Sequence, residues 1–153
     1  MSRSISIRRT AVAALVACSL LAAMMSASAG AATPRQGYYS GPTAQQAGLV
    51  DFKVFKYGSS TGTVRKLLKV GATTQLTCAS GEVKEDRFLA YIILGGKIDR
   101  LGRFKYAYKS FTIKGRFTTK TSAKGTLSRT VGDCSAENVS WTAKRTTGGI
   151  PIP

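Results

Sequence analysis

The chain has 153 residues, and its 23 Lys and Arg against seven Asp and Glu give it a formal net charge of +16 at pH 7. It contains no His, which excludes Ser–His and Cys–His nucleophile pairs and imidazole metal ligands. An excess of positive charge on this scale is typical of proteins that associate with polyanions.

The N-terminal 29 residues have the three parts of a secretory signal peptide. Residues 1–9 contain Arg and no acid, residues 10–25 are uncharged and apolar, and the small residues SASAGAA follow. Cleavage is predicted after Ala29 or Ala31. The apolar run is shorter than the roughly 20 residues that span a bilayer, so we expect a secreted protein without a transmembrane span in its mature chain. Because LVAC, ending at Cys18, resembles a lipobox, attachment to the cell envelope is the alternative.

Removal of the signal leaves about 122 residues, which is the size of one domain. Residues 30–48 are rich in Gly, Pro and Gln and are predicted to form a flexible N-terminal arm. A β domain is expected over residues 49–145, followed by a C-terminal tail over residues 146–153.

Beyond the arm, apolar and polar residues alternate, as they do in half-buried β-strands. The clearest predicted strands are residues 104–108 and 111–117, joined by a turn around Tyr108–Ser110. Residues 88–94 (FLAYIIL) are apolar on both faces, which favours a central strand or one covered by the arm. A Gly within the strand at residues 123–131 indicates a bulge or close backbone packing. The other predicted strands are residues 50–54, 64–70, 73–78 and 139–143.

About eight or nine short strands at intervals near ten residues, with no clear helix, predict a single all-β domain. We expect an antiparallel β-sandwich or flattened barrel. An export signal with two further cysteines predicts one disulfide, Cys78–Cys134. An immunoglobulin domain has its Trp between the two Cys, whereas Trp141 follows both of them. We therefore do not expect an immunoglobulin domain.

Five segments occur together in this chain: YSGPT (39–43), VDFKV (50–54), FTIKGRF (111–117), AKGTL (123–127) and WTAKR (141–145). In this combination, with Cys134 before the last segment, the chain resembles small secreted all-β proteins of uncharacterised function that are common in high-GC Gram-positive bacteria. The resemblance covers most of residues 38–145. It implies export and architecture, and it implies no catalytic residues.

Basic residues are concentrated between Lys97 and Lys124, where nine Lys and Arg accompany a single acid, Asp99. Alternate residues of a strand point to the same face. Lys105 and Lys109 on one strand, with Lys114 and Arg116 on the next, can therefore form one basic face if the two strands pair. Residues further along the chain can extend this face. The predicted anion-binding residues are Lys105, Lys109, Lys114, Arg116, Lys124, Lys144 and Arg145. The alternative is that these cations only solvate the outer face and protect edge strands.

Apolar residues that alternate with these cations are predicted to form the core. They are Phe104, Tyr106, Phe111, Ile113 and Phe117. Trp141 alternates with polar residues in the same way and is predicted to be a core residue whose indole N–H requires a buried acceptor.

The few acids offer one alternative chemistry, a carboxylate pair of the glycosidase kind. Glu82, Glu85 and Asp86 lie in a predicted polar turn at residues 80–87, and Asp133 and Glu137 flank Cys134. We interpret them as solvated loop charges and expect no enzyme activity, metal or cofactor. The sequence favours an exported, non-catalytic protein that binds a wall polymer, an acidic polysaccharide or extracellular nucleic acid. The alternative is an exported protein-interaction module whose partner is an unidentified protein and whose charge is incidental.

Overall fold

The computed structural model describes residues 32–59, 62–92 and 96–148. The predicted signal peptide with its cleavage sites and Cys18 lies outside these residues, as does most of the predicted C-terminal tail. Within the described part of the chain, no helix has the length and apolar character of a membrane span.

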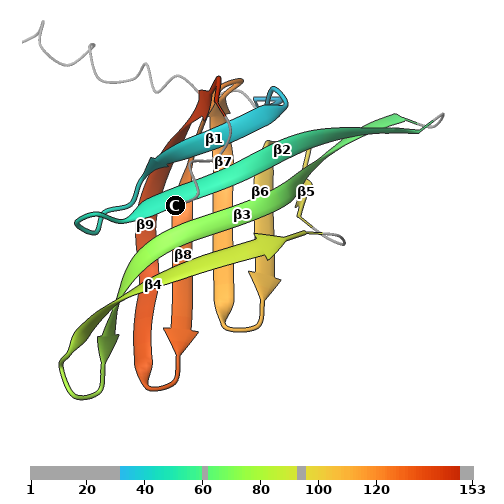
Figure 1. Cartoon of the computed structure of the whole chain (residues 1–153). Coiled ribbons are helices and arrows are strands. Elements are labelled where there is room, and N and C mark those ends of the chain that lie inside the picture. The colour runs from blue at the N-terminus through green and yellow to red at the C-terminus, as the bar shows by residue number, and fades with distance from the viewer. Residues whose placement is uncertain (1–31, 60–61, 93–95, 149–153) are drawn as a thin grey trace, which may run out of the picture.

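The described residues form nine β-strands and no α-helix, which confirms the predicted all-β class (Figure 1). The strands are β1 (Gly37–Pro42), β2 (Leu49–Ser59), β3 (Gly62–Cys78), β4 (Val83–Tyr91), β5 (Lys97–Ile98), β6 (Arg103–Tyr108), β7 (Phe111–Thr119), β8 (Ser122–Val131) and β9 (Cys134–Thr146).

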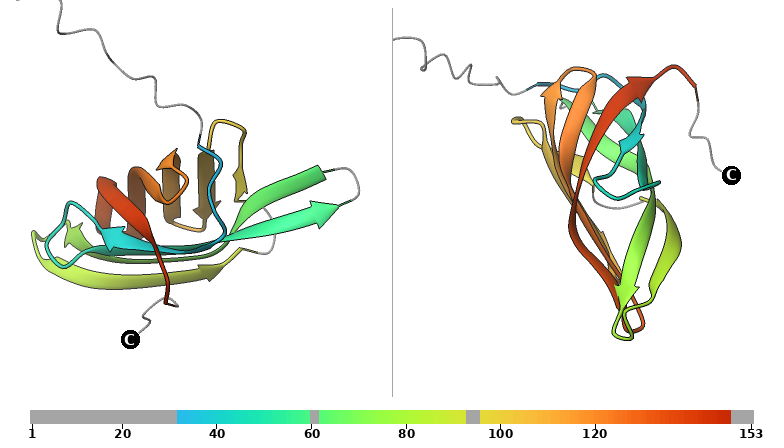
Figure 2. Two further views of the ribbon diagram at one scale, coloured as in Figure 1. Left: turned by 90° about the horizontal axis from the view of Figure 1, so that it is seen from above. Right: turned by 90° about the vertical axis from the view of Figure 1, so that its left-hand side faces the viewer.

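All nine strands belong to one antiparallel sheet with the order β4-β3-β2-β1-β9-β8-β7-β6, and β5 pairs with β3. The sheet folds back on itself, so that β4 to β1 face β9 to β6 as two layers that cross at an angle (Figures 1 and 2). A second contact joins the layers where β3 pairs with β9.

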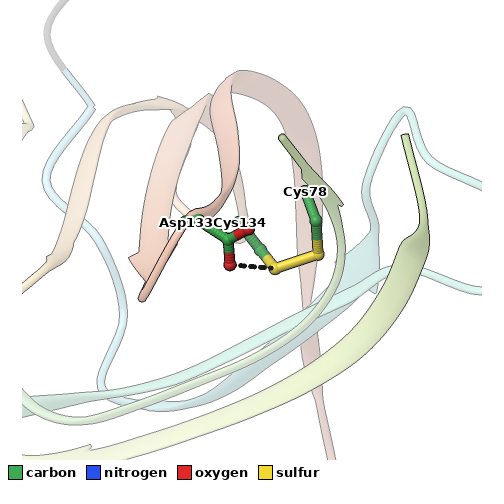
Figure 3. Close-up of side chains that lie close together, drawn as sticks. All are labelled: Cys78, Asp133 and Cys134. Atoms are coloured by element: carbon green, nitrogen blue, oxygen red, sulfur yellow. Dashed lines mark hydrogen bonds between the residues drawn. A yellow bond between two sulfur atoms is a disulfide. The ribbon is translucent and has the colours of Figure 1, made fainter. Parts of the chain in front are cut away.

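The predicted disulfide lies at this second contact. Cys78 and Cys134 are direct cross-strand partners, and their sulfur atoms are bonded (Figure 3). The bridge therefore fastens one layer to the other at the end of β3.

The core between the layers is aromatic. Phe111 and Ile113 are fully buried, and Phe117, Phe104 and Tyr106 are buried as well, as their alternation predicts. Trp141 is 2% exposed, and its ring stacks on Phe104 with centroids 6.0 Å apart.

Glycines of β7 and β8 let the ring of Trp141 approach the sheet closely. A Cβ on Gly115 would lie 2.6 Å from the Trp141 ring, and one on Gly125 would lie 1.9 Å from the Lys114 carbonyl oxygen. The predicted close packing at Gly125 is therefore confirmed, while the bulge of this strand lies between Leu127 and Arg129.

The prediction of a buried acceptor for the Trp141 indole is wrong for the described residues, where Nε1 has no hydrogen-bond partner. Burial of the ring outweighs this loss. An aromatic side chain of about 200 Å² gains roughly 5 kcal/mol at 25 cal/mol per Å², against about 1–3 kcal/mol for one unsatisfied polar group.

The expected flexible arm over residues 30–48 differs from the structure, because its middle part, residues 37–42, forms β1 between β2 and β9. Tyr39 is fully buried, and its ring stacks on Phe52 at a centroid distance of 5.2 Å. Its single hydroxyl proton is shared between the carbonyl oxygens of Arg35 and Lys120, at O···O distances of 2.7 and 3.1 Å. Burial raises the pKa of Tyr39 to about 12.

Strand lengths and one strand position also differ from the expectation. β3 has 17 residues and joins two predicted segments, 64–70 and 73–78, through Gly71. β4 begins at Val83, inside the predicted turn, and is an edge strand rather than a central one. Its outer face is uncovered, since Leu89 is 45% and Tyr91 67% exposed.

Candidate functional site

The outer face of β6, β7 and β8 brings most of the predicted anion-binding residues together. In the strand register, Lys105 lies opposite Lys114, and Arg116 lies between Arg103 and Lys124. All five side chains are exposed. The sequence prediction of one polar face opposite the aromatic core face therefore agrees with the positions of these residues.

Like charges that face each other across strands cost stability, by roughly 0.2–1 kcal/mol for each pair. Lys105/Lys114 and Arg116/Lys124 are two such pairs, and none of these four residues has an ion pair in the described residues. An anion bound between them would remove this repulsion.

Arg103 differs from its neighbours because it has a counter-ion. Its Nε lies 2.7 Å from Asp99 Oδ2, and its backbone N–H donates a 2.8 Å hydrogen bond to Asp99 Oδ1. The pKa of Asp99 is lowered, first by that backbone hydrogen bond and further by hydrogen bonds and charge from the Arg103 side chain. Arg103 is therefore neutralised at the border of the basic face.

A shallow groove runs along this face from β7 across β8 and β9 to β1. It consists of two depressions of about 490 and 590 Å³ that share Lys124 and Thr142 in their walls. We define it as the basic groove by the four cations that line it: Lys114, Arg116, Lys124 and Lys144. Hydroxyl side chains stand between these cations and belong to Ser40, Thr118, Ser122, Thr126, Ser140 and Thr142.

Three predicted anion-binding residues do not line the groove: Lys105 lies beside it on β6, and Lys109 and Arg145 lie away from it. Lys109 occupies the β6–β7 turn with a φ of 49°, and its Nζ lies 5.5 Å from the Tyr108 ring centroid. Arg145 has the strand parity of the inward-facing Ala143, and its Nε donates a 2.9 Å hydrogen bond to the Gln36 carbonyl oxygen. The sequence does not show either displacement. Lys109 has the same alternation as Lys105 but lies in the turn, and Arg145 directly follows Lys144, so its side chain points to the other face of β9.

Three of the five acids considered for hydrolysis are held in separate ion pairs. Glu82 pairs with Lys84 at 3.1 Å, and Glu85 pairs with Arg87 at 2.9 Å. Asp86 faces inward and forms a half-buried ion pair with Arg129 of β8, at 2.8 Å. These carboxylates each neutralise a nearby cation.

One cluster of potential metal ligands, Cys78, Asp133 and Cys134, lies at the disulfide (Figure 3). A carboxylate oxygen of Asp133 lies 3.4 Å from Cys134 Sγ. Metal binding by cysteine requires the thiolate, and both sulfur atoms are bonded to each other. This donor set therefore does not suit a metal ion.

Sequence reasoning missed a second set of cations, on the outer face of β2 and β3. Lys53 lies opposite Lys69, and Lys66 lies opposite Lys97 of β5. The alternation of Asp51 and Lys53 with apolar residues was a signal for this face. These lysines are spread over β2, β3 and β5, so they form no local concentration in the sequence like the one after Lys97.

The fold and the groove together define an antiparallel all-β domain with a basic outer surface. No protein-family model matches the chain, and neither a curated protein nor a solved structure does.

Proposed function

We propose that the protein is an exported, non-catalytic binding protein that associates with anionic polymers through the basic groove. The observation that carries the proposal is the set of like-charged neighbours in the groove. Arg116 of β7 lies opposite Lys124 of β8, and Lys114 and Lys144 line the same groove. None of these four cations forms an ion pair with a carboxylate in the described residues.

The shape of the groove supports a long ligand rather than a compact one. Its two depressions are open, and together they extend over four neighbouring strands, β7, β8, β9 and β1. Cations and hydroxyl groups along such a path match the repeated phosphate, sulfate or carboxylate groups of a polymer. Association of this kind weakens steeply as the salt concentration rises.

Retention on immobilised heparin, measured against salt concentration, tests the proposal. We expect the Lys114→Glu/Arg116→Glu variant to elute at much lower salt, with a smaller dependence of the binding constant on salt. Lys84→Glu/Arg87→Glu is the matched control, because it changes the net charge equally but lies on β4, where both cations already have acids beside them.

Equal elution of the two variants would show that net charge alone, and not the groove, holds the polymer. Recovery from spent medium of one protein partner that survives high salt, with wild-type heparin elution of the groove variant, would favour a protein-interaction module instead.

A further inference from the structure

The outer surface of β1 to β4 combines exposed aromatic rings with lysines, which the basic groove does not. Phe55 is 44% exposed and Tyr91 is 67% exposed. We define the aromatic–lysine face by Tyr38, Lys53, Phe55, Lys66, Lys69 and Tyr91. Exposed clusters of large apolar side chains mark interaction sites on soluble proteins.

Strand register places four of these residues in one row across the sheet. Tyr38 of β1 lies opposite Lys53 of β2, and Lys53 lies opposite Lys69 of β3. Lys69 in turn lies opposite Tyr91 of β4. Since neighbouring strands lie about 4.8 Å apart, the row is roughly 14 Å long.

Each end of the row pairs a ring with an ammonium group. The Nζ atom of Lys53 lies 4.8 Å from the Tyr38 ring centroid, and that of Lys69 lies 5.2 Å from the Tyr91 centroid. The next row repeats the pattern, because Phe55 lies opposite Lys66. Lys66 Nζ also lies 5.9 Å from the ring of Tyr57, which is 61% exposed.

Carboxylates near the row leave its lysines without ion pairs. Asp51 is the nearest acid along β2; it is only 6% exposed, and the charge of Lys69 acts on it without an ion pair. Glu85, further along β4, is paired with Arg87. Among the described residues, Lys53, Lys66 and Lys69 have no ion pair. The face therefore presents free positive charge beside accessible ring surfaces.

We propose that the aromatic–lysine face binds single-stranded nucleic acid, with bases stacked on Tyr38, Phe55 and Tyr91 and phosphates held by the neighbouring lysines. Each ammonium group lies over a ring on a flexible side chain, so it can swing to a phosphate and leave the ring face to the base of the same nucleotide. Proteins that bind single strands without sequence preference combine these same two elements. A duplex keeps its base faces stacked internally, so it would contact only the lysines.

Fluorescence anisotropy with a labelled oligothymidylate tests this site separately from the groove. The Phe55→Leu/Tyr91→Leu variant keeps apolar surface but removes two rings. We expect its dissociation constant for the oligonucleotide to rise at least about fivefold for each stacked base lost. Duplex DNA of the same length and heparin should bind with unchanged affinity.

Tyr108→Leu is the matched control, because Tyr108 is also an exposed tyrosine beside a lysine but lies at the β6–β7 turn. Wild-type oligothymidylate binding by Phe55→Leu/Tyr91→Leu would overturn the inference. So would an equal loss of heparin affinity, which would indicate an acidic glycan on this face. The groove variant Lys114→Glu/Arg116→Glu should keep the sensitivity of oligothymidylate binding to ring removal, so failure of the groove and failure of this face give different results.

Discussion

The two outer faces of the sheet are built from similar antiparallel strands but differ in their chemistry. On β7, β8 and β9, the outward positions hold Lys, Arg, Ser and Thr, and they form a groove with charge and hydroxyl groups. On β1 to β4, the outward positions hold Lys together with Tyr and Phe. Binding that depends on charge alone is lost at high salt concentration. Stacking of rings on bases adds a contribution to the binding free energy that salt affects little. The two faces carry similar charge but different side chains, so net charge alone does not distinguish the ligands proposed for them.

The largest effect is expected from a substitution that distorts only one of the two faces. Gly125→Ala places a Cβ 1.9 Å from the Lys114 carbonyl oxygen, which forces β7 and β8 apart. We expect a loss of about 1–3 kcal/mol in the free energy of unfolding, measured by urea titration. Retention on heparin should fall as well.

Gly71→Ala provides the matched change in the other layer. A Cβ at Gly71 would meet its nearest atoms at 3.5 Å, which is an ordinary contact. We therefore expect this variant to unfold at the wild-type urea concentration or slightly above it. A similar destabilisation of both variants would mean that close backbone packing does not distinguish the layers.

A smaller effect is expected at Asp51, the buried carboxyl of the aromatic–lysine side. Burial raises its pKa, while a hydrogen bond from Ser40 and the charge of Lys69 oppose the shift. A carboxyl whose pKa is higher in the folded state destabilises the fold once it ionises. Its contribution to stability is therefore most favourable below the unfolded pKa of about 3.9 and is lost as pH rises through the folded pKa.

We expect Asp51→Asn to unfold at a higher temperature than the wild type at pH 7 and at the same temperature near pH 3. Thermal unfolding across this pH range measures the difference. Glu137→Gln is the control, because Glu137 is exposed and has no ion pair among the described residues. A pH-independent difference for Asp51→Asn would contradict the assignment to ionisation.

The smallest effect is expected from removing one like-charge pair on the outer face of β6 and β7. Lys105→Glu turns the repulsion with Lys114 into an attraction across β6 and β7. We expect the variant to gain about 0.2–1 kcal/mol in the free energy of unfolding and to bind heparin more weakly. Lys109→Glu, at the turn, should change stability less, because Lys109 lies outside the paired strands. A loss of stability in Lys105→Glu would show that the repulsion is already screened.

Sequence periodicity was a good guide wherever one side of a strand is buried. The strands that contain Phe104, Phe111 and Phe117 were predicted because alternation follows burial directly. The segment at residues 88–94 misled for the same reason, since its outward Leu89 and Tyr91 are apolar without being in the core. Apolar residues on both faces meant an exposed patch here, not a central strand.

Positions that depend on partners distant in sequence could not be predicted. Tyr39 lies in a stretch rich in Gly and Pro, and β1 is a central strand because it pairs with both β2 and β9, with Tyr39 packed on Phe52 and Phe117. The joining of Ser40 and Lys144 in one groove depends on the pairing of β1 with β9, over a hundred residues apart in the chain. Local alternation carries no information about that pairing.

The pairing of β1 with β9 also constrains the order of folding. Tyr38 is in register with Thr146, so the first and last strands of the described chain are neighbours. β1 keeps only β2 as a sheet partner until β9 has formed. Because closing such distant contacts is entropically costly, sheets of this kind fold slowly compared with chains rich in local contacts. A chain truncated before β9 would leave Tyr39 and the inner edge of β1 uncovered, so folding of this domain can finish only after its C-terminal strand is available.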